Sequence, residues 1–198
     1  MIQHTKKRQC IVIVLMVSFV LSVFLPGLSA VAQDSGWKMY RFNESRTGNS
    51  PLTSNIVEPS VKWSFLTGGD VKSPPAVGDI NSDGELEVVF GSNDQHLYAL
   101  DKYGNELWNF PVQGPIVCSP TIGDVDGDGL SEIVFGGYFL DWGDPNLYVL
   151  NGEDGSPVWQ FTSGNIGAPY RGFQASALLC DISGDGIDDV LVGSMDHY

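Results

Sequence analysis

The sequence predicts an all-β fold of short strands joined by tight turns, and three observations support this prediction. The 198 residues include 24 glycines and 11 prolines, which place many turns between short apolar runs. Apolar runs such as residues 86–90 and 97–100 have the residue types and the length of strands, and no helix-length periodic segment follows residue 32. The chain also repeats itself, and this repetition indicates the architecture.

Three similar units follow one another along the chain. Each unit begins with Trp-x-Phe, at Trp63, Trp108 and Trp159, and continues to an acidic loop and an apolar strand that ends in glycine. The first two units then close with a Leu-Tyr-x-Leu strand and a glycine turn. The predicted organisation is a lead-in segment at 33–62, repeats at 63–107 and 108–158, and an incomplete repeat at 159–198.

Each full unit holds about four short strands in 45 to 51 residues, the size of one β-propeller blade. The predicted fold is therefore a partial β-propeller of four-stranded antiparallel blades, with two full repeats plus an incomplete third. Propellers close with at least ~4 blades. The sequence stops at His197-Tyr198, which aligns with His96-Leu97 or Tyr98 of the first repeat. We expect a fragment, a truncated chain, or assembly with further blades.

The Trp and Phe residues that open each unit are expected to pack blade against blade. Stacking of these rings on an aromatic ligand is the alternative. Residues 37–62 are long enough to donate one strand, although no arrangement of this chain alone closes a ring.

The net charge argues against two classes of partner. The chain has 24 acidic and 10 basic residues and a formal net charge of −14, although only 17% of its residues are charged. A surface this negative repels phosphate backbones and anionic lipid. Nucleic-acid binding and peripheral docking on membranes are therefore not expected.

Residues 1–32 read as an export signal. Basic residues at 6–8 precede an apolar run at 11–25, and Ala30-Val31-Ala32 supplies the small residues of a cleavage site. The apolar core is shorter than the roughly 20 residues of a spanning helix, so we expect cleavage after Ala32 and no stable membrane span. An uncleaved anchor is the alternative. The sequence therefore predicts a secreted, cell-surface or periplasmic protein, whose mature chain has seven basic and 24 acidic residues, a net charge of −17.

Three acidic loops, at 79–87, 124–132 and 181–189, fit the pattern D-x-[DNS]-x-D-G-x-x-[DE]. Oxygen side chains at positions 1, 3 and 5 converge when the chain coils tightly, and glycine at position 6 permits the sharp turn. A backbone carbonyl at position 7 and a carboxylate at position 9 then complete the set of about six oxygen ligands that calcium prefers. The candidate metal ligands are Asp79, Asn81, Asp83, Glu85 and Glu87; Asp124, Asp126, Asp128, Leu130 and Glu132; and Asp181, Ser183, Asp185, Ile187 and Asp189.

The loops are not EF-hands, because position 12 is Phe90, Phe135 or Val192 where an EF-hand needs a bidentate Glu. Plain surface turns without metal are the alternative. Ser183 makes the third loop the weakest candidate. The loops hold twelve acids, half of the total, and up to three calcium ions would change the net charge from −17 to −11. Magnesium fits less well, and we expect calcium affinities of about 10⁻⁴–10⁻³ M.

Two cysteines follow the export signal, Cys118 and Cys180. They occupy different positions in their repeats, so two buried, small apolar residues are expected, with one disulfide as the alternative.

The acidic loop followed by a Val-Phe-Gly strand, at 79–91 and 124–136, resembles the FG-GAP/VCBS repeats of integrin-α-type propellers. The Leu-Tyr-x-Leu segments at 97–108 and 147–159 resemble PQQ-like, quinoprotein-type propeller repeats, and the lead-in from Trp37 to Ser50 is similar to that of secreted PQQ-like proteins. The resemblance implies a β-propeller with calcium in the loops between the first two strands of each blade.

The expected function is a secreted calcium-binding FG-GAP/PQQ-like repeat protein, a non-catalytic adhesion or recognition scaffold with a protein or glycan partner. The alternative is the propeller part of a secreted enzyme, either a quinoprotein dehydrogenase or a polysaccharide-degrading enzyme. No catalytic constellation is visible in the sequence, because His96 and His197 occupy corresponding turn positions and no adjacent cysteine pair occurs. PQQ is therefore not expected. An outer-membrane assembly scaffold is a third reading, disfavoured by the missing lipid-attachment cysteine.

Overall fold

The computed structural model describes residues 36–42, 45–46, 60–140, 145–163 and 170–194. The chain divides into two compact units, Met1–Gln33 and Asp34–Tyr198, and the first unit lies outside the described residues. The predicted export signal therefore falls outside them as well. Within the described ranges, no helix is long and apolar enough to cross a membrane.

The first sheet contains four antiparallel strands in the order β1-β2-β3-β4. Its strands are β1 (Ala76–Gly78), β2 (Glu87–Gly91), β3 (His96–Leu100) and β4 (Glu106–Pro111). The turn between β3 and β4 is tight because Gly104 adopts a φ of 82°, a left-handed conformation in which glycine has no steric penalty. Each strand pairs with the next strand in the chain, as expected for a propeller blade.

The second sheet repeats this arrangement in the order β5-β6-β8-β9. Its strands are β5 (Thr121–Gly123), β6 (Glu132–Gly136), β8 (Asn146–Asn151) and β9 (Pro157–Thr162). The last two strands of each sheet shift register at the same place, between Ala99 and Leu100 and between Val149 and Leu150. An additional two-stranded ribbon, β7 (Tyr138–Leu140) with β10 (Tyr170–Gly172), was not anticipated from the sequence.

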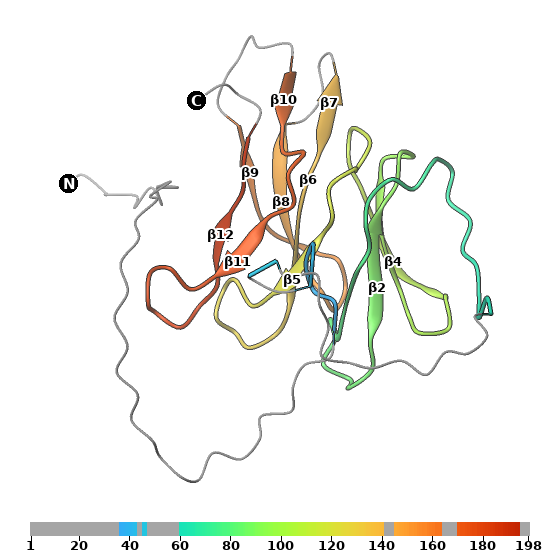
Figure 1. Cartoon of the computed structure of the whole chain (residues 1–198), viewed down its shortest axis with the longest axis horizontal. Helices are drawn as coiled ribbons and strands as arrows, with labels where there is room; N and C mark the ends of the chain where they lie inside the picture. Colours follow the sequence, from blue (N-terminus) through green and yellow to red (C-terminus); the bar gives the residue numbers. More distant parts are fainter. Residues whose placement is uncertain (1–35, 43–44, 47–59, 141–144, 164–169, 195–198) are drawn as a thin grey trace. The chain divides into compact units, whose positions relative to one another are not determined.

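A third sheet begins with β11 (Leu178–Cys180) and β12 (Asp189–Leu191), which pair antiparallel. The all-β fold class and the partial propeller of four-stranded blades are thus confirmed (Figure 1). The sheets are out of phase with the sequence repeats by one strand. Trp108 lies in β4 and Trp159 lies in β9, so the Trp that opens the second and the third sequence repeat belongs to the last strand of the preceding sheet, whereas Trp63 lies before β1 and in no strand.

Two apolar clusters join neighbouring blades. The first combines residues of the first blade, such as Val89, Leu97 and Trp108, with Ile122 and Ile133 of the second. The second cluster has blade-two residues on one side and residues around β11 on the other, and it comprises Val125, Val134, Leu147, Val149, Phe173, Ala177 and Leu179. The core of the molecule therefore lies largely between the sheets, as propeller packing requires.

The glycine that ends the second strand of a blade is required by this packing. A Cβ atom on Gly91 would lie 2.2 Å from Cγ2 of Ile116, and one on Gly136 would lie 2.3 Å from the carbonyl oxygen of Phe173. The segment that enters the next blade passes directly over each glycine. The glycine of the Val-Phe-Gly signature is therefore required by the close approach of neighbouring blades.

Neither Cys118 nor Cys180 forms a disulfide, so the disulfide alternative is wrong. Cys118 is buried as expected, and its sulfur lies 3.3 Å from both the carbonyl oxygen and the amide nitrogen of Gly136. Burial raises the pKa of this thiol to about 11, so it remains protonated and behaves as a small core residue. Cys180 is only half-buried.

The described part of the lead-in runs along the first strands of the blades. The carbonyl oxygen of Trp37 accepts a hydrogen bond from the amide of Val77 in β1 (2.8 Å), and that of Lys38 accepts one from Ile122 in β5 (2.9 Å). Trp37 forms an isolated antiparallel bridge with Val77. Among the described lead-in residues, this bridge takes the place of the donated strand that the sequence allowed.

Candidate metal centre

The acidic loops connect the first two strands of each sheet, and all three lie at the same end of the unit, the lower end in Figure 1. The second and third loops touch, because the amide of Asp188 donates a hydrogen bond to the carbonyl oxygen of Asp124 (3.2 Å). The repeat thus brings the acidic residues of consecutive blades together at one end.

Two left-handed residues make each loop coil. Glycine at position 6 has a φ of 85° in Gly84, 87° in Gly129 and 88° in Gly186, as its role in the turn predicted. Position 4 is also left-handed, with a φ of 60° in Ser82, 86° in Gly127 and 78° in Gly184. The left-handed conformation at position 4 was not predicted from the sequence, although the glycines at this position in the second and third loops were a signal for it.

The first aspartate of each loop is held by the glycine at position 6. An oxygen of Asp79 accepts the amide hydrogen of Gly84 at 3.0 Å, and the same bond joins Asp124 to Gly129 at 3.0 Å and Asp181 to Gly186 at 2.9 Å. The same contact in three loops shows that the repeated pattern encodes one backbone conformation, which turns the first carboxylate toward the interior of the coil.

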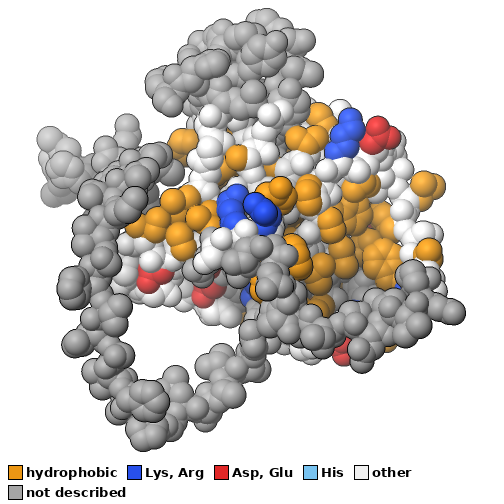
Figure 2. Space-filling view, in the orientation of Figure 1, with side chains coloured by type: hydrophobic (Ala, Val, Ile, Leu, Met, Phe, Trp, Pro, Cys, Tyr) orange, Lys and Arg blue, Asp and Glu red, His pale blue; other side chains and the backbone are white. Residues whose placement is uncertain are grey.

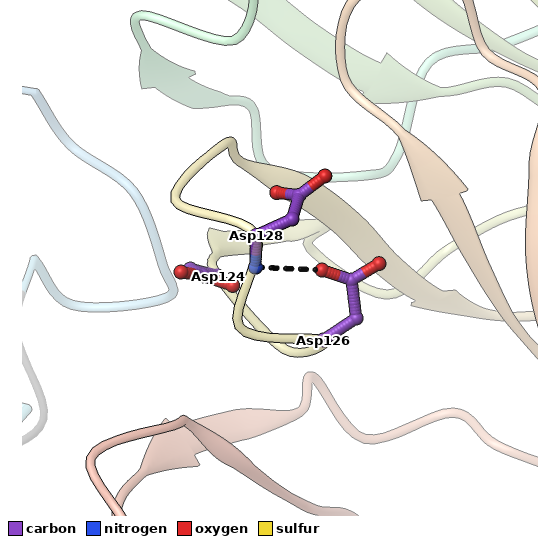
Figure 3. A group of neighbouring side chains, drawn as sticks. All are labelled: Asp124, Asp126 and Asp128. Atoms are coloured by element: carbon purple, nitrogen blue, oxygen red, sulfur yellow. Dashed lines mark hydrogen bonds between the residues drawn. The ribbon is translucent and has the colours of Figure 1, made fainter.

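In the second loop, three predicted ligands converge. One carboxylate oxygen from each of Asp124, Asp126 and Asp128 lies within 4.8 Å of the others. Asp126 accepts the amide hydrogen of Asp128 at 3.1 Å (Figure 3), and Asp128 accepts that of Leu130 at 2.8 Å. Each of these carboxylates has a second oxygen, so the loop offers hard donors on a short, ordered turn.

The first loop has the same backbone but a mixed donor set. The side-chain nitrogen of Asn81 lies 3.2 Å from a carboxylate oxygen of Asp83. The Oδ1 atom of Asp79 is buried and has no hydrogen-bond partner among the described residues. An orphaned carboxylate oxygen in an acidic coil is costly unless a cation offsets its charge.

The third loop follows the pattern with weaker donors. The Ser183 hydroxyl lies 3.4 Å from Oδ1 of Asp181, and Asp185 accepts the amide hydrogen of Ile187 at 3.0 Å. Within the described residues, only the second loop brings three acidic side chains within 4.8 Å of one another.

The carboxylate at position 9 sits at the base of the loop. It accepts the amide hydrogen of position 2 in every loop, from Ile80 to Glu87 at 3.1 Å, from Val125 to Glu132 at 2.8 Å and from Ile182 to Asp189 at 2.9 Å. Glu132 is not one of the group formed by the three aspartates. In this geometry, position 9 closes the base of the loop with one oxygen, and its predicted role as a metal ligand stays a prediction.

Burial changes the acidity of two of these groups. Glu132 is only 1% exposed, and burial together with the charges of Asp126, Asp128 and Asp124 raises its pKa to about 7, against the opposing effect of the hydrogen bond from Val125. Burial also raises the pKa of Glu87, with the charges of Asp83 and Asp79 adding to the effect. A bound divalent cation would favour the ionised form of each glutamate and would therefore lower its pKa.

The donor chemistry fits calcium. Carboxylate, amide and hydroxyl oxygens on a coiled turn match the hard, flexible coordination that calcium prefers, and neither histidine nor thiolate is among the predicted ligands. The convergent aspartates of the second loop and the orphaned oxygen of the first loop both suit a small, doubly charged cation.

The successive four-stranded sheets and the loops between their first two strands define the class of this chain as a β-propeller repeat protein. Residues 124–192 match the model of the FG-GAP-like repeat family. The matched stretch runs from the second acidic loop to the strand that follows the third acidic loop. A search of curated proteins gave no match.

Three solved structures align with part of this chain at low identity. The C-terminal domain of PilY1 from Pseudomonas aeruginosa is 23% identical, with a TM-score of 0.47 over 61% of this chain and 28% of that chain. BamB from Moraxella catarrhalis is 16% identical, with a TM-score of 0.39 over 61% of this chain and 34% of that chain. BBS1N in complex with ARL6DN is 13% identical, with a TM-score of 0.42 over 65% of this chain and 39% of that chain. The chain aligns with less than two-fifths of each of these structures.

Proposed function

We propose that this chain is a secreted, calcium-binding repeat protein of FG-GAP/VCBS and PQQ-like type that serves as a non-catalytic recognition scaffold. The observation that carries the proposal is the convergence of Asp124, Asp126 and Asp128 within one of three loops of the same conformation. Calcium in these loops stiffens the ends of the blades and positions them for a protein or glycan partner.

Electrostatics supports the role of a cation. Clustered carboxylates in tight turns repel one another, and this repulsion lowers the stability of the folded chain unless a cation offsets it. Half of the acids of the chain lie in the three loops, so the repulsion among these twelve acts within the loops. A ligand that binds only the folded state adds stability by mass action.

Exposed apolar side chains beside the loops support recognition. Leu130 is 43% exposed and Ile182 is 63% exposed, each in a loop rich in acidic residues and glycine. Apolar tips next to ordered charges are suited to contact with a partner.

Thermal unfolding of the full chain with calcium, with magnesium and with a chelator tests this function. We expect calcium to raise the melting temperature at millimolar concentrations and magnesium to raise it less. An identical melting curve in all three conditions would remove the calcium part of the proposal.

Secretion rests on the first 32 residues and has its own test. Expression with the native leader, followed by N-terminal sequencing of the exported protein, is expected to give a mature chain that begins at Gln33. Retention of the chain in the membrane fraction with Met1 intact would favour the anchor.

The contacts made by the loop carboxylates and by His96 support the non-catalytic role. Many of the loop carboxylates accept backbone hydrogen bonds within their own loops, and the Nδ1 atom of His96 lies 3.0 Å from the carbonyl oxygen of Asp94. Incubation of the chain with PQQ, calcium and an alcohol is expected to give no dye reduction. Turnover in that assay would establish the quinoprotein alternative instead.

A further inference from the structure

The second and third acidic loops contact each other through the segments that carry their predicted ligands. The amide of Asp188 donates a hydrogen bond to the carbonyl oxygen of Asp124 (3.2 Å). The Asp188 carboxylate lies against the residue before Asp124, because a Cβ atom on Gly123 would be 2.8 Å from its Oδ2 atom. Asp124 is position 1 of the second loop, and Asp188 is position 8 of the third, between the predicted ligand positions 7 and 9. The contact therefore joins the ligand-bearing backbone of both loops.

A side-chain contact accompanies this hydrogen bond. A Cβ atom on Gly127 would lie 2.6 Å from Cδ1 of Ile187, so the isoleucine packs directly on the glycine. Gly127 is the left-handed residue at position 4 of the second loop, with a φ of 86°. Ile187 is position 7 of the third loop, whose carbonyl is a predicted ligand. The missing side chain at position 4 thus gives the third loop its place on the second.

The first and second loops lack both contacts. Position 4 of the first loop is Ser82, which carries the Cβ atom that Gly127 lacks. The residue of the second loop that corresponds to Ile187 is Leu130, which is 43% exposed. No hydrogen bond among the described residues joins the first loop to the second. The three loops therefore follow one pattern, but their contacts with one another differ.

Order in the second loop supports order in the third. A cation held by Asp124, Asp126 and Asp128 would fix the coil that presents the Asp124 carbonyl and the face of Gly127. Residues 187–188 lie on this coil. A loop that is already ordered loses less conformational entropy when it binds a cation, so its affinity is higher.

We propose that the second and third loops bind calcium cooperatively, whereas the first loop binds it independently. The proposal rests on the proposed calcium-binding function and adds the coupling, which it assigns to Ile187 on Gly127 and to the hydrogen bond from Asp188. By linkage, each of the two loops raises the affinity of the other by the same factor. Neutralisation of charge by the first cation acts in the opposite direction, and about 0.15 M salt weakens this effect.

Calorimetric calcium titrations of the full chain in about 0.15 M salt test the coupling. Asp79→Asn with Asp83→Asn disables the first loop and leaves the coupled pair, for which we expect a Hill coefficient of about 1.4, as for two sites coupled ~5-fold. Asp181→Asn with Asp185→Asn disables the third loop and leaves the first two, for which we expect a Hill coefficient of about 1.

Two further substitutions, made in the chain whose first loop is disabled, address the contact itself. Ile187→Ala removes the side chain that packs on Gly127 and keeps the carbonyl of position 7. Gly127→Ser gives the second loop the residue that the first has at position 4. Each is expected to lower the Hill coefficient toward about 1. Ile182→Ala is the matched control, because Ile182 lies in the same loop, is 63% exposed and is not a predicted ligand.

The outcomes separate the coupling from calcium binding. Saturable binding with a Hill coefficient of about 1 in the coupled pair would overturn the coupling and leave the calcium sites in place. A higher coefficient that Ile187→Ala and Gly127→Ser leave unchanged would also overturn it. Absence of saturable binding by the wild-type chain would remove the proposed function and the coupling together. Because the two substitutions lie in different loops, a folding defect in one, seen in its melting curve, leaves the other as the test.

Discussion

Each acidic loop is organised by contacts between single residues. The carboxylate at position 1 accepts the amide hydrogen of position 6, and the carboxylate at position 9 accepts that of position 2. These bonds leave Asp124, Asp126 and Asp128 close together while Glu132 is buried below them. The four acids are therefore coupled, and a change in one alters the electrostatic cost of the others.

Glu132 should make the metal-free chain less stable as the pH rises. Its folded pKa of about 7 lies above the ordinary value of 4.5, so the folded state holds this proton more tightly than the unfolded state does. The resulting stabilisation is complete below pH 4.5 and is lost as the pH rises toward 7, by an amount on the order of 3 kcal/mol. Glu87, whose pKa is also raised, acts in the same direction.

Melting temperatures in chelator, from about pH 5 to about pH 7.5, measure this effect. Glu132→Gln should flatten the decline, and the exposed Glu153→Gln is the matched control, expected to leave it unchanged. If Glu132→Gln behaves like Glu153→Gln, then Glu132 is not the group responsible.

The aspartates of the second loop should contribute most to calcium affinity. Asp126→Asn removes one charge from the convergent group and is expected to weaken calcium binding by roughly tenfold, because a ligand charge is lost while the side chain keeps its size. Asp154→Asn, in an exposed turn outside the loops, serves as the control. Calcium-dependent melting curves compare the two variants, and equal shifts would contradict the assignment.

At the residue scale, the sequence predicted the oxygen donors and the glycine of position 6, because both recur in all three loops. It did not predict the left-handed conformation at position 4. Gly127 and Gly184 suggest this conformation, but the first loop has Ser82 at the same position, so the glycine does not recur in all three loops. The hydrogen bond from Val125 to Glu132 was not predicted either, because the spacing of residues in the loop pattern does not show that the position-9 side chain folds back to the base of the loop.

Among the elements, the strand that ends in glycine shows how the blades fit together. Gly91→Ala and Gly136→Ala would place a methyl group 2.2 Å from Ile116 and 2.3 Å from Phe173, so each should destabilise the fold by about 2 kcal/mol or more. Gly193 occupies the same repeat position, and its nearest neighbour would be 3.9 Å away. Gly193→Ala is therefore the matched control, with an expected effect within about 0.5 kcal/mol.

Urea unfolding of the three variants measures these differences. Equal losses of stability at all three positions would show that the glycines matter for the strand itself and not for the contact between blades.

The Trp residues should form a graded series in the same assay. Trp108→Ala removes a buried ring and its hydrogen bond, and is expected to cost about 3–5 kcal/mol. Trp159→Ala should cost much less, because its ring is 37% exposed. Similar costs for both substitutions would contradict the difference in burial.

The order of the strands was predictable, because each has an apolar run bounded by turn residues. The phase of the sheets was not predicted, because Trp108 and Trp159 open repeats in the sequence but lie on the last strand of the preceding sheet. The β7–β10 ribbon escaped prediction as well, since it interrupts the second repeat without a counterpart in the first.

Across the molecule, the negative charge is concentrated and not spread. Figure 2 shows a broad patch of hydrophobic side chains on one face with few acidic side chains, while half of the acids belong to the three loops. The repeat places those loops at one end, where the second and third touch through Asp188 and Asp124. The composition gives the net charge of the chain, whereas the fold shows that half of the acidic residues lie at one end of the blades.

Calorimetric titration of the chelator-treated full chain with calcium tests the central claim most directly. We predict saturable binding at up to three sites, with dissociation constants of about 10⁻⁴–10⁻³ M. The heat should fall in a variant that carries Asp124→Asn, Asp126→Asn and Asp128→Asn together. No saturable heat from the folded wild-type chain, or an unchanged titration of the triple variant, would contradict the calcium-binding account.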